Sequence, residues 1–199
     1  MNHTKLKFII GSVAIIIIAT VVFVFLLFER EQQETTAIVS PDNCLPAFRD
    51  GGGPYYEPNV PFRDKLVPED NEGEKLIVEG YLYNEDCTRT ISNAVIDIWQ
   101  ASEEGEYEEE YYRGKIVTDD TGYYKFETVV PLGYGEGTAY RPPHIHFKVF
   151  VDDIEIVTSQ MFFEDVRGVE GFEDEYIIEL ENNNETWIGI HNIVLPDYQ

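Results

Sequence analysis

The stretch RPPHIHFKVFV, residues 141–151, decides how the fold of this chain is interpreted. Successive side chains of a β-strand point to opposite faces. A strand over 144–151 therefore puts His144 and His146 on one face, and Ile145 and Phe147 on the other. The apolar face predicts burial in a core, and two imidazoles on one strand face can bind a single metal ion. The alternative is a pair of ordinary strand histidines.

Short apolar runs separated by turn residues continue on both sides of this stretch. They predict strands over residues 75–83, 94–100, 123–130, 144–151, 154–163, 176–181 and 186–195. DDTG at 119–122 and NNN at 182–184 are typical turns between strands. The pattern favours an all-β fold, an antiparallel β-sandwich with long ordered loops. Residues 44–74, rich in proline and glycine, are expected to form one of these loops.

The N-terminal part of the chain has a different character. Residues 8–28 are almost entirely apolar, and as a helix rising ~1.5 Å per residue they would span about 31 Å, roughly one bilayer core. Lys5 and Lys7 precede this run, so the positive-inside rule places the N-terminus in the cytoplasm and the domain outside. We expect a cytoplasmic head and transmembrane helix over 1–30, a linker over 31–43 and one domain over 44–199. A cleaved signal peptide, giving a secreted domain, is the alternative.

The charge of the chain limits its partners. The formal net charge is −24 over 199 residues. A surface this acidic repels phosphate backbones, so nucleic acid is not an expected partner. The sequence contains no Gly-rich phosphate loop, nucleophile elbow or zinc-finger spacing.

Cys44 and Cys87 are the two cysteines of the chain. In a domain outside the cytoplasm, a disulfide between them is the natural expectation. It would tie the start of the domain to the turn after the first clear strand. Two free buried thiols are the alternative, and the absence of Cys-x-x-Cys spacing gives no indication of a redox motif.

Tyrosines in glycine-marked turns supply possible partners for a metal at the histidines. Tyr107 and Tyr134 lie in such turns, and Arg141 lies just before the histidine pair. A free tyrosine has a pKa of about 10, so only a strongly Lewis-acidic ion holds it as phenolate at neutral pH. Ferric iron fits, because it is hard and prefers anionic oxygen. Copper or zinc is the weaker hypothesis, since thiolate or carboxylate partners would then be expected.

The order of these motifs resembles that of the intradiol ring-cleavage dioxygenases, the family of catechol and protocatechuate dioxygenases. The resemblance runs from about Cys44 to Phe163. Its marks are GPYY at 53–56, NAVIDIWQ at 93–100, GEY at 105–107, DTGYYKF at 120–126, RPPHIHF at 141–147 and TSQMFF at 158–163. The chain looks like the extracytoplasmic, single-domain branch, because a membrane segment stands where cytoplasmic members carry a helical dimerisation region.

The resemblance implies a non-haem Fe(III) site and cleavage of catechol-type diols with O2 to muconate-type products. The family's four protein ligands are matched by Tyr107, Tyr134, His144 and His146. Arg141 matches the arginine that steadies negative charge on the substrate ring, and Gln160 matches a polar residue at the same pocket.

Several alternatives stay open at this point. Tyr140 lies closer to the histidines in sequence than Tyr134 and competes with it as the second tyrosine ligand. Tyr55 and Tyr56 either line the substrate pocket or cap the sheet. The glutamates around Tyr107 would disfavour a carboxylated substrate if they lie at the pocket mouth, so a neutral catechol is expected over protocatechuate. The competing function is a membrane-tethered binding or adhesion module whose metal site is degenerate or structural.

Overall fold

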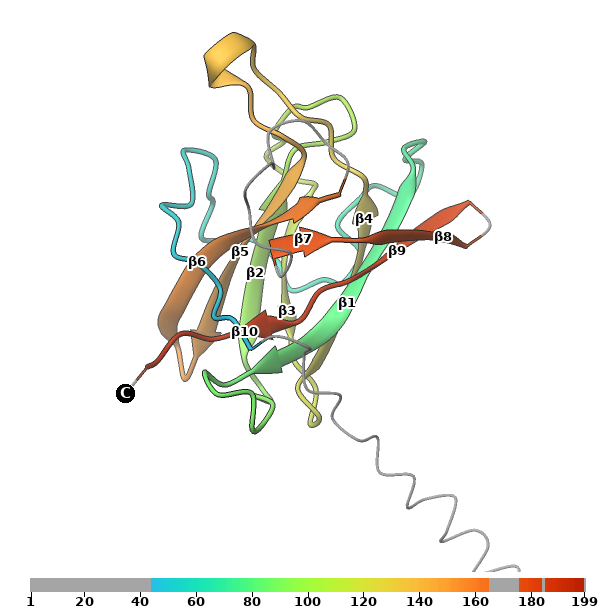
Figure 1. Cartoon of the computed structure of the whole chain (residues 1–199). Helices are drawn as coiled ribbons and strands as arrows, with labels where there is room; N and C mark the ends of the chain where they lie inside the picture. Colours follow the sequence, from blue (N-terminus) through green and yellow to red (C-terminus); the bar gives the residue numbers. More distant parts are fainter. Residues whose placement is uncertain (1–43, 165–175, 184, 199) are drawn as a thin grey trace, which may run out of the picture. The chain divides into compact units, whose positions relative to one another are not determined.

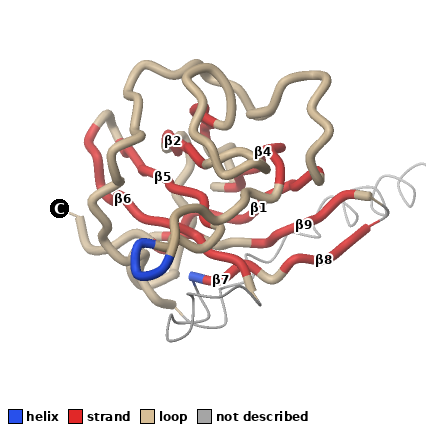
Figure 2. The backbone as a smooth tube through the Cα atoms, turned by 90° about the horizontal axis from the view of Figure 1, so that it is seen from above, coloured by secondary structure: helices blue, strands red, loops and turns tan. Residues whose placement is uncertain are grey.

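The computed structural model describes residues 44–164, 176–183 and 185–198, which form two β-sheets of five strands each (Figure 1). The strands are β1 (Lys75–Tyr83), β2 (Val95–Gln100), β3 (Arg113–Val117), β4 (Tyr123–Val129), β5 (His144–Val151), β6 (Ile154–Phe163), β7 (Ile177–Ile178), β8 (Leu180–Asn183), β9 (Thr186–Ile190) and β10 (Ile193–Val194). A short 3₁₀ turn, η1 (Gly137–Ala139), lies between β4 and β5. Long loops join the strands (Figure 2), and the all-β prediction is confirmed.

The two sheets differ in how their strands are connected. In the first sheet, β1 pairs with β4 on one side and with β9 and then β10 on the other, while β8 pairs with β9. The second sheet has the order β3-β2-β5-β6-β7, so β5 is its central strand. The pairs β1–β9, β1–β10 and β6–β7 are parallel. The expectation of a purely antiparallel sandwich is therefore wrong at these pairs, because C-terminal strands return to β1 and β6 without a hairpin.

One apolar cluster joins the two sheets and explains the alternation on β5. The cluster contains buried side chains of β1 and β4 from the first sheet and of β2, β5 and β6 from the second. On β5, Ile145 and Phe147 belong to it. The two-residue period of a strand then turns His144 and His146 to the opposite face, which is also buried.

Several strand boundaries differ from those expected. The strand β3 was not predicted, because its sequence RGKIV is short and mixes two cationic residues with few apolar ones. The expected strand over 176–181 contains β7 and the start of β8, and the one over 186–195 is divided into β9 and β10. The division follows from Asn192, whose side-chain Oδ1 accepts from the backbone N of Tyr81 at 3.0 Å in place of a backbone carbonyl.

Residues 44–74 form the expected loop without regular strands. A disulfide joins Cys44 to Cys87, which confirms the expected pairing. Further along the loop, the backbone N of Asp50 donates to the carbonyl of Thr158 on β6 at 2.8 Å. The loop is therefore held against the second sheet over a separation of many residues.

The described ranges contain no helix that is both long and apolar enough to cross a membrane. The expected transmembrane segment, residues 8–28, and the expected linker, residues 31–43, lie outside the described residues. The division into head, linker and domain stays a prediction.

Candidate metal centre

The strand β5 brings the two histidines into direct contact. The Nε2 atoms of His144 and His146 lie 3.1 Å apart, and the two side chains are only 2 % and 3 % exposed. His146 pairs across the sheet with Trp99 on β2 and with Gln160 on β6. Backbone pairing on both sides of the strand thus sets the position of His146, and His144 is paired with Phe162 on β6.

The ring nitrogens of His144 have distinct roles. Its Nδ1 lies 2.5 Å from the carbonyl oxygen of Pro142, and because a carbonyl only accepts, Nδ1 carries the proton and Nε2 keeps a lone pair. Burial lowers the pKa of His144 to about 4. Burial, together with the neighbouring His144, lowers the pKa of His146 to about 3. Both rings are neutral at physiological pH, the state in which imidazole binds metals.

An aromatic stack holds His146 in place. The Trp99 ring lies parallel to His146, with ring centroids 4.9 Å apart and planes inclined by 3°. Tyr56 also packs against Trp99, at a centroid distance of 4.9 Å, and its hydroxyl donates to Oδ2 of Asp97 at 3.0 Å. Tyr56 therefore supports Trp99, the ring that packs against His146. Tyr56 is not among the residues that line the cavity beside the site, which is described below.

The loop over residues 101–112 carries Tyr107 to the histidines. Ser102 organises this loop: its backbone N donates to the Glu106 carbonyl at 2.8 Å, and its hydroxyl accepts from the Glu106 backbone N at 3.3 Å. The Tyr107 hydroxyl lies 3.4 Å from Nε2 of His144. Burial, and next a hydrogen bond with Tyr134, raise the pKa of Tyr107 far above its ordinary value. A phenolate at this position requires a strong cation beside it.

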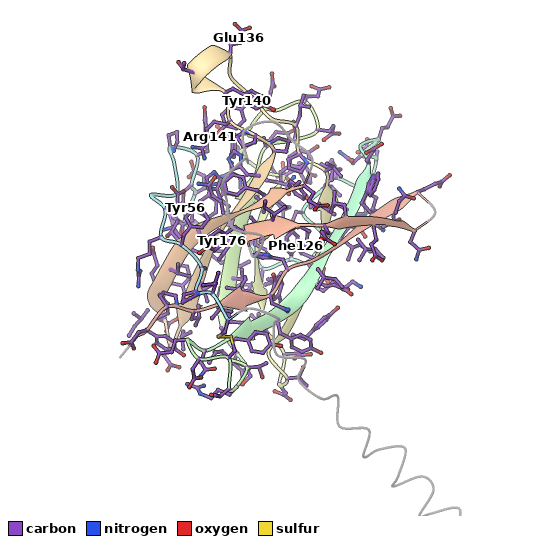
Figure 3. All side chains as sticks on the ribbon, in the orientation of Figure 1. Tyr56, Phe126, Glu136, Tyr140, Arg141 and Tyr176 are labelled. Atoms are coloured by element: carbon purple, nitrogen blue, oxygen red, sulfur yellow. A yellow bond between two sulfur atoms is a disulfide. The ribbon has the colours of Figure 1, made fainter. Side chains whose placement is uncertain are left out.

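The loop over residues 131–143 carries both candidates for the second tyrosine. Two backbone hydrogen bonds of 3.0 and 2.8 Å tie Tyr134 to Arg141 at its base, and η1 closes the loop between them. Figure 3 shows Glu136 at the tip of this loop, Tyr140 below it and Arg141 at the base.

The structure brings Tyr134 to the histidines. Its ring centroid lies 5.7 Å from that of Tyr107 and 5.8 Å from that of His144. The Tyr140 hydroxyl lies against Gly133, 2.6 Å from the place that a Cβ there would occupy. Gly133 thus lets Tyr140 fold back onto its own loop, and Tyr134 meets the other expected ligands.

A cavity of about 270 Å³ lies beside these side chains. Its lining consists of Asp50, Gly53, Pro54, Tyr55, Tyr134, Arg141 and His146. Gly52 and Gly53 have φ angles of 76° and 66°, a region that glycine adopts without strain, and they turn the loop past the cavity. Tyr55 lines the cavity and stacks on Tyr107, with centroids 4.1 Å apart and planes inclined by 10°.

Arg141 lines this cavity and contacts Gln160. Nη2 of Arg141 donates to Oε1 of Gln160 at 2.7 Å. Nε2 of Gln160 donates to Oδ2 of Asp50 at 2.6 Å. Asp50 was missed from the sequence, where the three glycines that follow it are the only local signal of an unusual turn.

The donor set of the site suits a hard trivalent cation. Two neutral imidazoles supply lone pairs, and two tyrosine hydroxyls can become anionic oxygen ligands. Within the described part of the chain, no three His, Cys, Asp or Glu side chains come together in a way that could hold a metal ion. Tyr107 and Tyr134 are the additional donors beside the histidine pair.

The glutamates around Tyr107 do not line the cavity, contrary to one expectation from the sequence. The charged groups in its lining are Asp50 and Arg141. Glu103, for example, accepts hydrogen bonds from Asn71 and Tyr112 at 2.8 and 2.9 Å instead. The one carboxylate in the lining therefore comes from the loop over 44–74, and Arg141 is beside it in the same lining.

Comparison with known proteins gives the family. A family model described as Dioxygenase (Dioxygenase_C) matches residues 52–179. The chain is 30 % identical over 141 residues to a chlorocatechol 1,2-dioxygenase of Pseudomonas putida, over 59 % of this chain and 54 % of that protein. The chain belongs to the intradiol ring-cleavage dioxygenase family. This dioxygenase chain spans about half the length of the curated relatives it matches.

Solved structures share the fold of this intradiol dioxygenase domain. One is the dioxygenase domain of a dioxygenase carbohydrate-binding protein fusion from Streptomyces sp. SirexAA-E, with a TM-score of 0.68 and 26 % identity over 77 % of this chain and 100 % of that one. Another is an intradiol ring-cleavage dioxygenase from Tetranychus urticae, with a TM-score of 0.66 and 23 % identity over 76 % of this chain and 95 % of that one. The second likeness shows the fold alone.

Proposed function

We propose that this chain cleaves catechol-type aromatic diols with O2 in the intradiol manner, using a non-haem Fe(III) ion, and releases muconate-type products. The observation that carries the proposal is the convergence of two imidazoles and two tyrosines beside a cavity that contains an arginine. A bound ferric ion supplies the Lewis-acid and redox chemistry that makes the aromatic diol reactive toward O2. The residues of the chain bind the ion, orient the substrate and shield the site.

The four expected ligands have two kinds of role. His144 and His146 offer neutral Nε2 atoms whose positions are fixed by the strand. Tyr107 and Tyr134 would hold a bound ferric ion through their hydroxyl oxygens. A tyrosine oxygen that is not bound to the metal could accept a proton from an arriving diol, so the pair would also provide a local base.

Arg141 places its guanidinium at the cavity. One nitrogen of this guanidinium donates to Gln160 at 2.7 Å. A fixed charge of this kind stabilises negative charge that develops on the substrate ring and its oxygens without reorganisation during the reaction.

We propose a neutral catechol as the preferred substrate over a ring-carboxylated one such as protocatechuate. Asp50 lines the cavity with its side chain 28 % exposed. Burial alone would raise the pKa of Asp50, but hydrogen bonds from the backbone of Gly52 and Gly51 and from Gln160 together lower it, so the group is charged at neutral pH. A substrate carboxylate would meet this charge in a chain with a net charge of −24. Equal or faster turnover of protocatechuate by the purified protein would contradict the preference.

Colour is the first test of the iron site. Phenolate bound to ferric iron gives a visible charge-transfer band, so the iron-loaded protein is expected to be red-brown and to change colour with catechol under anaerobic conditions. Tyr107→Phe should reduce both iron content and turnover, whereas Tyr111→Phe, on the same loop, should leave both near the wild-type values. Iron content and turnover that are unchanged in Tyr107→Phe would reject the ligand assignment.

A binding or adhesion module with a degenerate or structural metal site is the other hypothesis, and no observation favours it. A module without chemistry has no physical need for two tyrosines, two histidines and an arginine at one cavity. Absence of iron from carefully reconstituted protein would favour the module and end the case for the enzyme.

We also propose that residues 8–28 anchor the chain in a membrane, with the domain outside the cytoplasm. The apolar run supports the anchor, and the Cys44–Cys87 disulfide supports an oxidising compartment. Full-length protein that leaves the membrane fraction on alkaline extraction would contradict an uncleaved anchor and favour the secreted form.

A further inference from the structure

Asp50 ends a hydrogen-bond chain that the proposed chemistry leaves unexplained. The chain runs from Arg141 Nη2 to Gln160 Oε1 at 2.7 Å, and from Gln160 Nε2 to Asp50 Oδ2 at 2.6 Å. It joins the base of the 131–143 loop, the strand β6 and the 44–74 loop. These segments are distant in sequence, and they meet at the wall of the cavity.

The two end groups of this series of hydrogen bonds fix which groups donate and which accept. A guanidinium has only donors, and an ionised carboxylate has only acceptors. The amide of Gln160 has one of each, so a single orientation satisfies both neighbours: its oxygen faces Arg141 and its nitrogen faces Asp50. Without the carboxylate, only Arg141 selects this orientation of the amide, and Nε2 of Gln160 loses the acceptor that holds the amide in place.

Asp50 is itself held in place by its backbone and its own turn. Its backbone N donates to the Thr158 carbonyl at 2.8 Å, and Oδ2 accepts from the backbone N of Gly52 at 3.2 Å. The left-handed φ of 76° at Gly52 makes this turn possible. The carboxylate is therefore presented to Gln160 by a rigid segment.

The same carboxylate faces one of the expected metal ligands. Oδ2 of Asp50 lies 3.9 Å from Nδ1 of His146, a buried nitrogen that has no hydrogen-bond partner in the described residues. A negative charge on that side favours the tautomer with the proton on Nδ1, which leaves the Nε2 lone pair free toward His144.

We propose that Asp50 is a positioning residue: through the amide of Gln160 it holds the guanidinium of Arg141 in its orientation at the cavity. The inference rests on the proposed function for its meaning in turnover. Asp50 has no contact with the reacting atoms in this role. It fixes a charge that acts on them, and such a charge contributes most when it is oriented in advance.

A set of variants tests the proposal in the full-length, iron-reconstituted protein. Asp50→Ala is expected to lower kcat for catechol about tenfold, with a smaller change in KM, because Arg141 acts on charge that develops during the reaction. Asp50→Asn keeps a carbonyl that can accept from Gln160, so it should recover to within about threefold of wild type. Asp50→Ser keeps the turn but is too short to reach Gln160, so the same loss of kcat, about tenfold, is expected. It replaces Asp50→Ala in the test if Asp50→Ala does not fold.

A double variant shows whether Asp50 acts on turnover through Gln160 or independently of it. If Asp50 acts through Gln160, then Asp50→Ala combined with Gln160→Leu should lose no more activity than Gln160→Leu alone. Asp120→Ala, in the turn at the far end of β3, is the matched control and should retain wild-type kinetics. Losses that multiply in the double variant, or an Asp50→Ala protein with the kinetics of the control, would overturn the proposal.

A measurement on the metal-free protein gives an independent readout. The side-chain amide signals of Gln160, assigned by their disappearance in Gln160→Leu, should shift and exchange faster with water in Asp50→Ala, and should stay close to wild type in Asp50→Asn. Signals that are unchanged in Asp50→Ala would also overturn the proposal. A wild-type protein that binds no iron defeats the proposed function instead, and the amide signals then still test the positioning.

Discussion

The candidate metal centre consists of two halves that are held in different ways. The histidine half lies on β5, where pairing with both β2 and β6 fixes His146 and pairing with β6 fixes His144. The tyrosine half lies on two loops, which are held by one serine hydroxyl, a bridge of two backbone bonds, and ring stacking. The first half shares the contacts of a whole sheet, whereas the second depends on a few local ones.

This difference teaches which half sets the position of a metal and which half can be adjusted. Side chains on a central strand cannot move without disturbing the core beneath them, since Ile145 and Phe147 on the same strand belong to it. Loop side chains can change with little cost to the fold. We infer that the histidine half locates the metal and that the tyrosine half sets its charge and its exchangeable position.

The largest effect is expected at the histidine half. His146→Ala removes a ligand at the fixed position, and we expect turnover and iron content to fall by about a hundredfold or more, beyond the loss of a residue that only orients a ligand. Lys148→Ala, on the same strand and face, removes a partly exposed ion pair with Glu155 and a cation–π contact with Tyr56, but no metal ligand, and should have little effect. Iron content by elemental analysis checks this, and wild-type iron in His146→Ala would refute the role of the strand.

The next largest effect separates the two tyrosines of the 131–143 loop. Tyr134→Phe should lower turnover by about tenfold or more and shift the charge-transfer band, because it deletes an anionic ligand and leaves the ring packing. Tyr140→Phe should retain both the band and the turnover. The opposite result, with the larger loss in Tyr140→Phe, would assign the second ligand to Tyr140.

A smaller effect is expected from the stack that holds the tyrosine half. Tyr55→Leu removes the ring that stacks on Tyr107, a contact worth roughly 0.5–1.5 kcal/mol, so turnover should fall about three- to tenfold. Tyr55→Phe keeps the ring and is the matched control. If Tyr55→Leu had no effect on either turnover or the charge-transfer band, the loop would be held by other contacts.

The smallest effect on turnover is expected far from both halves. Replacing Cys44 and Cys87 by serine removes the disulfide, and the free energy of unfolding should fall by roughly 2–4 kcal/mol. Turnover per folded molecule should stay close to wild type, because neither sulfur lies at the cavity. Denaturant unfolding of the intact and the reduced protein measures the free energy of unfolding. If turnover were lost before the protein unfolds, the disulfide would be coupled to the site.

The histidine half of the site could be predicted from the sequence, but most of the side chains that surround and hold it could not. Alternation over 144–151 is a local pattern, so it indicated the strand, the buried faces and the metal-binding pair. The glycine-marked turns drew attention to Tyr107 and Tyr134, but only resemblance to a family assigned them as ligands, because loops have no periodicity that fixes where a side chain points. The choice between Tyr134 and Tyr140 depends on how the 131–143 loop folds back on Gly133, which sequence order does not encode.

The contacts that cross the chain were the ones that sequence reasoning missed. Asp50 meets Gln160 across a separation of 110 residues, and no spacing rule connects them. The strand β3 was missed because its burial comes from tertiary contacts: Leu66 packs close to Gly114, where an added Cβ would lie 2.8 Å from its Cδ2. Likewise, the stacking of Trp99 on His146 emerges only when β2 and β5 pair.

The stack of Trp99 on His146 also provides a fluorescence signal that reports whether iron is bound. Trp99 lies flat against His146, whereas the second tryptophan, Trp187, belongs to β9 in the other sheet and donates its indole N–H to Glu74 at 3.1 Å. A paramagnetic ion on the imidazole should quench the emission of the first indole far more than that of the second. Fluorescence of the unlabelled protein can therefore follow iron uptake and loss in real time, with Trp187 as the built-in reference.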